Sequence, residues 1–126
     1  MIYGIGTDIV SIERVQTIIN KNRDGFINRV LTEHERALFT NKADSAAFCA
    51  KRFAAKEAFS KALGTGIGRV LSFQDLTVRS NENGKPYFMP IGKLKAYIDD
   101  LGITKTHVSL SDEKEYAIAF AILEKK

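Results

Sequence analysis

The chain has 126 residues, of which 44% are hydrophobic and 27% charged, and its formal net charge is +4. This composition is too apolar for a disordered chain, and the longest apolar runs are far shorter than the roughly twenty residues of a membrane-spanning helix. We therefore expect one globular domain over residues 1–126, an anionic partner and, because no basic leader opens the sequence, a cytoplasmic location.

The N-terminal third predicts one strand and two helices. The segment from Ile2 to Ile5 is short and contains β-branched residues, which is typical of a strand, and a loop leads from it to Ser11, a good helix N-cap. Apolar residues then recur at helical spacing, with basic residues elsewhere on the circumference. Thr32 and Glu35 match a capping box, so a second, short helix should begin there.

The longest periodic segment lies in the middle of the chain. Asp44 and Ser45 are its candidate N-caps, and strong helix formers continue to Leu63, where Gly64 predicts a C-terminal cap. Small and aromatic side chains occur almost all the way round this helix, so we expect it to be enclosed. Cys49, the only cysteine, lies within it and is assigned to packing, because a reactive thiol needs a nearby base or cation.

The C-terminal half predicts several strands and one further helix. Residues 70–78 are typical of a strand, and residues 81–84 have the turn chemistry of a hairpin. Pro90 can open a helix that stops at Gly102, and two more strands flank the polar turn at 112–115. The predicted class is α+β, with a small, mainly antiparallel sheet packed around the long central helix.

Two carboxylates stand out as candidates for chemistry. Glu57 interrupts the packed circumference of the central helix, and a buried carboxylate needs a partner, which Lys61 one turn later can supply as a salt bridge. Asp8 follows the first strand in a loop, where it would be a turn residue if considered alone. Two carboxylates from separate elements are also an incomplete ligand set for Mg²⁺, which takes further ligands from water and substrate phosphates. The residues alone leave both interpretations open.

The glycine segments are weaker evidence for a phosphate site. Gly4 and Gly6 precede a predicted helix, but Ile9 stands where the dinucleotide-binding fingerprint requires a third glycine. Further glycines within residues 64–68 follow a helix and lack the GK[ST] sequence of a P-loop. Considered alone they end the helix, although they would also let the backbone approach phosphates closely.

His107 shares the polar face of a predicted strand with Ser109 and Ser111. A Ser/His hydrolase is not supported, because no nucleophile elbow is present and no acid partner can be assigned. His107 is therefore either a structural histidine or, together with Lys61, a contact for phosphates. His34, inside the capping box, should be an exposed helix residue.

These segments together resemble holo-(acyl-carrier-protein) synthase, the short bacterial type of 4'-phosphopantetheinyl transferase. The two most telling motifs are Gly-Ile-Gly-Thr-Asp-Ile at residues 4–9 and Phe-Ala-Ala-Lys-Glu-Ala-Phe-Ser-Lys-Ala at residues 53–62. The resemblance spans nearly the whole chain. Its shorter matches lie at residues 64–68, 71–75, 83–86 and 107–111.

The resemblance implies the 4'-phosphopantetheinyl transferase fold and a specific reaction. A serine hydroxyl of an apo acyl carrier protein attacks the β-phosphate of coenzyme A and releases adenosine 3',5'-bisphosphate, a step that supports fatty acid biosynthesis. Asp8 and Glu57 would hold Mg²⁺ against the pyrophosphate, while Lys61 and His107 contact the phosphates. The implied catalytic residues are Glu57, Lys61 and His107, with Glu57 the first candidate for the base that removes the serine proton and His107 the second.

The resemblance also implies a nucleotide pocket that draws on several segments. The glycine loop and the hairpin turn would supply backbone, and basic side chains would contact the phosphates. The expected members of this pocket are Arg52, Lys61, Gly64, Gly66, Asn83, Gly84, Lys85, Pro86 and His107.

The partners follow from the same resemblance. Carrier proteins are acidic, which gives Arg14, Lys21 and Arg23 a docking role on or just after the first helix, with a solvated helix face as the alternative. Relatives are trimers with sites at subunit boundaries, so a homotrimer is expected. The rival hypothesis is a small basic binding module for an acidic protein or nucleic acid. It has less support, because nucleic-acid-binding signatures are missing and the basic residues are mixed with 15 acidic ones.

Overall fold

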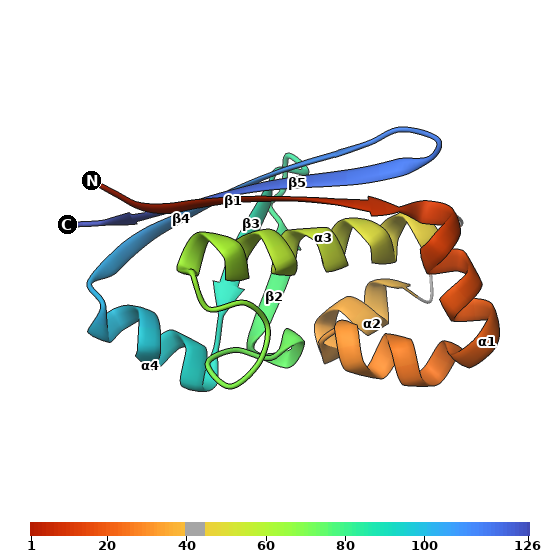
Figure 1. Cartoon of the computed structure of the whole chain (residues 1–126), viewed down its shortest axis with the longest axis horizontal. Coiled ribbons are helices and arrows are strands. Elements are labelled where there is room, and N and C mark those ends of the chain that lie inside the picture. The colour runs from red at the N-terminus through yellow and green to blue at the C-terminus, as the bar shows by residue number, and fades with distance from the viewer. Residues whose placement is uncertain (40–44) are drawn as a thin grey trace.

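The computed structural model describes residues 1–39 and 45–126 (Figure 1). Asp44, a candidate N-cap of the central helix, lies outside the described residues. The elements are, in chain order, β1 (Ile2–Ser11), α1 (Ile12–Val30), α2 (Glu33–Phe39), α3 (Ser45–Leu63), the 3-10 turn η1 (Phe73–Asp75), β2 (Leu76–Ser80), β3 (Pro86–Pro90), α4 (Gly92–Asp100), β4 (Ile103–Asp112) and β5 (Tyr116–Lys125). The α+β class is confirmed.

Two antiparallel sheets accompany the central helix. One has the strand order β1-β5-β4, and the other pairs β2 with β3. The helix α3 runs along one face of the three-stranded sheet, while α1 and α2 lie beyond one half of α3 and α4 lies beyond the other (Figure 1). In α3, 14 of the 19 residues are buried and Lys61 alone is exposed, so this helix is enclosed as predicted.

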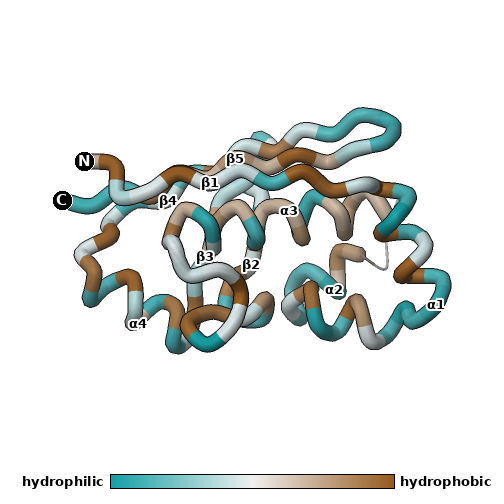
Figure 2. The backbone as a smooth tube through the Cα atoms, in the orientation of Figure 1, coloured by the Kyte–Doolittle hydropathy of each residue, from teal (hydrophilic) through white to brown (hydrophobic). Residues whose placement is uncertain are grey.

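The two faces of the three-stranded sheet differ in composition. On β5, the side chains of Ala117, Ala119 and Ala121 are buried against α3. The alternate positions point the other way and carry Ile118 and Phe120, which are exposed. Figure 2 shows hydrophobic stretches along β1 and β5. We call this second side the outer face, and its exposed apolar residues are Ile5, Ile9, Ile118 and Phe120.

Gly4 and Gly6 let β1 lie directly on the backbone of α3. A Cβ at Gly4 would collide with the carbonyl oxygen of Ala62, and a Cβ at Gly6 with the carbonyl oxygen of Ala58. The glycines of the N-terminal motif thus serve the close packing of a strand on a helix. This packing brings Asp8 to the surface of α3.

The first helix contains a break. Its start is as predicted, since the Ser11 hydroxyl accepts a hydrogen bond from the backbone N–H of Arg14 at 3.2 Å. The helix is interrupted at Asn22, whose φ of −152° and ψ of 73° are not helical. The Asn22 side chain accepts a hydrogen bond from the N–H of Gly25 at 3.2 Å and so caps a second helical segment.

The capping box predicted at Thr32 is present and buried. Oε1 of Glu35 accepts a hydrogen bond from the backbone N–H of Thr32 at 2.9 Å, and the Thr32 hydroxyl accepts one from the N–H of Glu35 at 3.4 Å. Oε2 of Glu35 also accepts a hydrogen bond from the N–H of Val78 in β2 at 2.7 Å. His34, which lies between Thr32 and Glu35 in the sequence, is exposed as predicted.

Lys56 of α3 is fully buried and completes this network. Its Nζ donates hydrogen bonds to Oε1 of Glu35 at 2.6 Å, to the carbonyl of Val30 at 2.7 Å and to the carbonyl of Phe73 at 3.0 Å. The buried ammonium group therefore has three acceptors, which offsets the cost of removing its charge from water. These contacts tie α3 to the end of α1, to α2 and to η1.

The structure corrects three local expectations. The first strand does not end at Ile5, because β1 pairs with β5 along its length, so Asp8 lies in a strand and not in a loop. The strand expected at 70–78 begins only at Leu76, after the turn η1. Pro90 ends β3 instead of opening α4.

Other local expectations are confirmed. Gly64 and Gly102 follow α3 and α4 with φ of 88° and 80°, the left-handed conformation of a helix stop. Cys49 is buried, and burial raises the pKa of its thiol to about 12, which leaves it unreactive. Within the described part of the chain, no helix combines the length and the apolar character needed to cross a bilayer.

Candidate active site

Asp8 and Glu57 line one cavity at the contact between β1 and α3. Asp8 comes from the face of β1 that packs against α3, and Glu57 from α3 itself, where its side chain is half-buried. Burial raises the pKa of Glu57 and the charge of Asp8 raises it further, while the charges of Lys61 and Arg29 lower it. The two carboxylates are therefore close enough to repel each other.

Lys61 neutralises part of this negative charge. Its Nζ lies 3.1 Å from Oδ1 of Asp8 and donates a hydrogen bond to the carbonyl of Thr7 at 3.0 Å. Among the ion pairs of the described residues, Lys61 is paired with Asp8 and not with Glu57. Lys61 thus does not form the salt bridge with Glu57 that their spacing in α3 permits. Its ion pair with Asp8 joins α3 to β1 instead.

The cavity beside these residues has a volume of about 230 Å³ and lies between β1, α1 and α3. We call it the acidic cavity. Besides Asp8 and Glu57 it has one charged lining residue, Arg14. Its apolar wall includes Val10, Val15, Ile18, Phe26 and Phe53.

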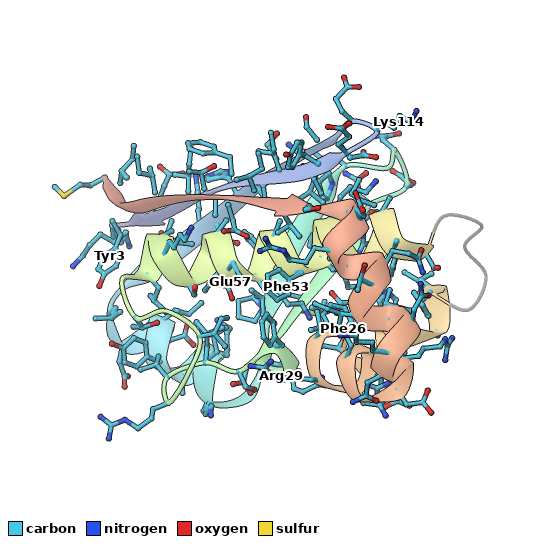
Figure 3. The ribbon with its side chains drawn as sticks, turned by 45° about the vertical axis from the view of Figure 1, so that its right-hand side comes forward. Tyr3, Phe26, Arg29, Phe53, Glu57 and Lys114 are labelled. Atoms are coloured by element: carbon cyan, nitrogen blue, oxygen red, sulfur yellow. The ribbon has the colours of Figure 1, made fainter. Side chains whose placement is uncertain are left out.

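Aromatic rings stack beneath the acidic cavity. The ring centre of Phe53 lies 6.4 Å from that of Phe26 and 5.4 Å from that of Phe73. The guanidinium of Arg29 lies 5.5 Å from the centre of the Phe73 ring, and Figure 3 shows Arg29 below Phe53 and Glu57. Arg29 was not predicted as a site residue, because a basic residue in the last turn of a helix by itself indicates only helix-end stabilisation.

A second cavity, of about 300 Å³, lies against β3, β4 and β5. Its lining includes Lys85, Pro86 and His107, which were expected in the nucleotide pocket, together with Ser109 and Phe120. We call it the basic cavity. The structure thus brings together three of the predicted pocket residues from two separate segments of the chain.

Asn83 and Gly84 belong to the hairpin turn that leads into this region. The side-chain oxygen of Asn81 accepts hydrogen bonds from the backbone N–H groups of Asn83 and Lys85 at 2.8 and 3.0 Å. Gly84 has a φ of 81°, which a residue with a side chain rarely adopts. Local sequence therefore fixes the shape of the turn, while Asn83 and Gly84 themselves do not border the basic cavity.

His107 contacts a carboxylate that the sequence did not indicate. Its Nε2 lies 2.6 Å from Oε2 of Glu124, and both side chains are partly exposed. The hydrogen bond between them lowers the pKa of Glu124. The register between β4 and β5 brings these two residues together, and the sequence alone does not specify this register.

The two cavities lie on opposite faces of the three-stranded sheet. Asp8 is opposite Ala119, which points to α3, whereas His107 is opposite Ile122, on the outer face. Residues directly opposite each other in antiparallel strands point to the same face. One chain therefore does not bring His107 to Lys61, so a site in which both contact the same phosphates needs more than one chain.

Arg52, expected in the nucleotide pocket, borders neither cavity. Its guanidinium lies 4.3 Å from the centre of the Phe48 ring and donates a hydrogen bond to the carbonyl of Val78 at 3.5 Å. Burial lowers its pKa, and among the described residues its buried Nε has no hydrogen-bond partner. A phosphate contact of Arg52 stays a prediction.

The glycine loop after α3 uses its amides to end the helix. The backbone N–H groups of Gly64, Thr65 and Gly66 all donate hydrogen bonds to the carbonyl of Ser60, at 3.0, 3.2 and 3.2 Å. Gly66 has a left-handed φ of 68°. These are the contacts of a helix stop, and a role of Gly64 and Gly66 in the nucleotide pocket stays a prediction.

The predicted docking residues Arg14, Lys21 and Arg23 are all exposed. Arg14 also lines the acidic cavity, so it is next to the carboxylate pair. Arg23 is already engaged, since its guanidinium lies 3.4 Å from the carboxylate of Asp24 and 5.1 Å from the ring centre of Phe39. Arg14 is therefore the strongest of the three candidates.

The fold is that of one transferase class, because residues 4–121 match the family model of the 4'-phosphopantetheinyl transferase superfamily. The chain belongs to this family. A holo-[acyl-carrier-protein] synthase from Ruthia magnifica subsp. Calyptogena magnifica is 64% identical to it over 124 residues, which cover 98% of both chains.

Solved structures have the same fold. The crystal structure of holo-[acyl-carrier-protein] synthase from Neisseria meningitidis matches with a TM-score of 0.95 and 42% identity, over 99% of this chain and 100% of that one. The structure of a holo-(acyl-carrier-protein) synthase from Bacillus anthracis str. Ames, in complex with CoA (3',5'-ADP), matches with a TM-score of 0.84 and 39% identity, over 100% and 99% of the two chains. The predicted transferase fold is therefore confirmed.

Proposed function

We propose that this protein is a Mg²⁺-dependent holo-(acyl-carrier-protein) synthase. It transfers the 4'-phosphopantetheine group of coenzyme A to a serine of apo acyl carrier protein, a step of fatty acid biosynthesis, and releases adenosine 3',5'-bisphosphate. The main support is the acidic cavity, which Asp8 and Glu57 line and next to which Lys61 pairs with Asp8, in a chain that is 64% identical to a protein of that name. A purely binding role would leave this charge arrangement without a function.

The acidic cavity fits a hard divalent cation. Asp8 and Glu57 supply carboxylate oxygens from two elements, and their mutual repulsion is the arrangement that a cation relieves. Among the described residues no group of three or more His, Cys, Asp or Glu side chains gathers around a common point, so the remaining ligands would be water and phosphate oxygens. When bound, Mg²⁺ would neutralise charge on the pyrophosphate of coenzyme A.

The residues of the chain position the reactants and neutralise charge. The carrier serine oxygen forms a bond to the β-phosphorus of coenzyme A, and the bond from that phosphorus to the bridging oxygen breaks. Lys61 stabilises the negative charge that builds on the departing phosphate. Asp8 holds the Lys61 ammonium group in place through their contact of 3.1 Å.

Glu57 is the base that we assign to the serine proton. It borders the same cavity as Asp8, and as a ligand of the proposed cation it would be ionised, which is the form that can accept a proton. Its competitor Asp8 is engaged by Lys61. His107, the second candidate, lies on the other face of the same chain and contacts phosphates in this proposal.

A homotrimer would join the two cavities. The outer face exposes apolar side chains that a second copy would remove from water, which supports association through this face. In this assembly His107 of one subunit faces the acidic cavity of the next. The cavities on opposite faces of one chain would then form composite sites.

Mass measurement of the carrier tests the transferase function. Incubation with coenzyme A, Mg²⁺ and apo acyl carrier protein should increase the mass of the carrier by one phosphopantetheine group, and an unchanged mass would overturn the proposal. Asp8→Ala and Glu57→Ala should abolish transfer with little loss of fold. Asp100→Ala, which removes an exposed carboxylate at the end of α4, is the control and should be fully active.

A mixing experiment tests the composite site. Asp8→Ala and His107→Ala should each be almost inactive as pure proteins. Trimers assembled from both variants contain boundaries at which intact Asp8 and intact His107 meet, so part of the activity should return. Lack of any recovery, with subunit exchange verified by mass spectrometry, would contradict sites shared between subunits.

A further inference from the structure

Glu124 touches the histidine of the basic cavity and has no role in the function proposed above. Its Oε2 lies 2.6 Å from Nε2 of His107, across the adjacent strands β4 and β5. His107 lines the basic cavity, whereas Glu124 is not among the residues that border it. Glu124 therefore contacts the ring without bordering the space available to a ligand.

The chemistry of this contact decides which ring nitrogen carries hydrogen. The hydrogen bond with His107 lowers the pKa of Glu124, desolvation opposes this shift, and the charges of Lys105 and of the N-terminal ammonium group lower the pKa further. Glu124 is thus ionised, and an ionised carboxylate only accepts hydrogen bonds. The hydrogen in this contact must therefore lie on Nε2 of His107, and Nδ1 is the ring nitrogen left for a ligand.

We propose that Glu124 is a positioning residue for phosphate recognition by His107. It holds the ring through Nε2 and directs Nδ1 into the basic cavity, where Nδ1 donates a hydrogen bond to a phosphate oxygen of the nucleotide. Nδ1 donates in the form of the ring in which both nitrogens carry hydrogen, and this form can contact the carboxylate through Nε2 and a phosphate through Nδ1 at the same time. Lys85 adds a second positive charge to the same cavity.

This inference rests on the proposed function, in which the basic cavity binds the nucleotide of coenzyme A. Binding of adenosine 3',5'-bisphosphate, measured by titration calorimetry without carrier or transfer, tests it directly. Glu124→Ala should weaken binding about tenfold, the order expected for one charge-assisted hydrogen bond. Glu124→Gln keeps an acceptor for Nε2 but loses the charge, so its loss should be smaller. Glu33→Gln changes an exposed carboxylate at the start of α2 and should bind like the wild type.

A double-mutant cycle shows whether Glu124 acts through the histidine. In the His107→Ala background, Glu124→Ala should cause almost no further loss of affinity, because the group that it positions is gone. Nitrogen–proton NMR of the His107 ring should place hydrogen on Nε2 in the wild type. Glu124→Ala should remove this preference, which a merely structural residue would not do.

The outcomes separate this inference from the proposed function. Equal affinity of the wild type and Glu124→Ala, additive losses in the double variant, or a ring that carries hydrogen on Nδ1 alone would overturn the role of Glu124 and leave the transferase proposal intact. A wild-type protein that does not bind adenosine 3',5'-bisphosphate would overturn both. Circular dichroism of each variant confirms that the fold is unchanged.

Discussion

Lys56 and Glu35 form an ion pair of 2.6 Å in which neither side chain is exposed to water. Lys56 precedes Glu57 in α3, so a buried structural charge is next to the half-buried carboxylate to which we assign a function. Burial lowers the pKa of Lys56, and the charge of Glu35 opposes this shift. The pair thus connects the packing of the surrounding elements to the helix that presents Glu57.

The first prediction concerns this ion pair. Lys56→Met should lower the free energy of unfolding by about 3–5 kcal/mol, because it leaves the Glu35 carboxylate buried without its cation. Lys51→Met removes a partly exposed partner of Asp112 and should cost less than about 1 kcal/mol. Urea unfolding at neutral pH measures both losses. Similar values for the two variants would show that the buried pair does not anchor α3.

The second prediction concerns the contact between β1 and α3. Gly6→Ala should lower the free energy of unfolding by about 1–3 kcal/mol, because the new methyl group meets the carbonyl of Ala58 and forces the strand away. Transfer activity should fall as well, since Asp8 moves with the strand. Gly68→Ala is the control, because no atom lies within 4 Å of its added Cβ. Full activity and stability of Gly6→Ala would contradict this role of the glycine.

The third prediction concerns the pH dependence of stability. Burial and the charge of Asp8 raise the pKa of Glu57 above its usual value of 4.5, so the folded state keeps this proton to higher pH than the unfolded state. Stability therefore falls as the pH rises from the unfolded to the folded pKa. The neutral side chain of Glu57→Gln does not titrate, so without Mg²⁺, which Glu57 is proposed to bind, this variant should be more stable than the wild type at neutral pH.

The size of this effect is limited by solvent. Because Glu57 is only half-buried, the gain of Glu57→Gln should stay below about 1 kcal/mol and should vanish under acidic conditions. Chemical unfolding over a series of pH values measures it, and the exposed Glu33→Gln should show no such trend. A gain that does not change with pH would exclude titration of Glu57 as its cause.

The fourth prediction concerns carrier docking. Arg14→Glu should weaken binding of apo carrier protein about tenfold at low salt, and added salt should reduce the difference from the wild type. Lys114→Glu reverses an exposed charge in the turn between β4 and β5, which Figure 3 shows far from Glu57, and should bind normally. Surface plasmon resonance at several salt concentrations measures both variants. Equal carrier binding by the two variants would show that Arg14 is an ordinary solvated residue without a docking role.

Features that depend on neighbouring residues could be predicted from the sequence. The N-cap at Ser11 and the capping box of Thr32 and Glu35 each involve residues within one helical turn, and both are present. The second role of Glu35 could not be predicted, because Lys56 and Val78 reach it only through tertiary packing.

The candidate site likewise has a part that could be predicted from the sequence and a part that depends on tertiary structure. Asp8 and Glu57 were identified as carboxylates from separate elements, and the structure brings them to one cavity, while Lys61 pairs with Asp8 beside it. The position of His107 on the other face depends on strand register, since a shift of one residue would reverse the face of every side chain in the strand. The contact of His107 with Glu124 depends on the same register and had no sequence signal.

The placement of Asp8 and His107 on opposite faces of one sheet bears on how the protein behaves at low concentration. In the proposed assembly a dissociated subunit has half of each of two sites and none that is whole. Specific activity should therefore drop steeply when a stock is diluted below the subunit dissociation constant, and it should return on reconcentration. In such an enzyme, the amount of protein present in the cell sets the fraction that can act.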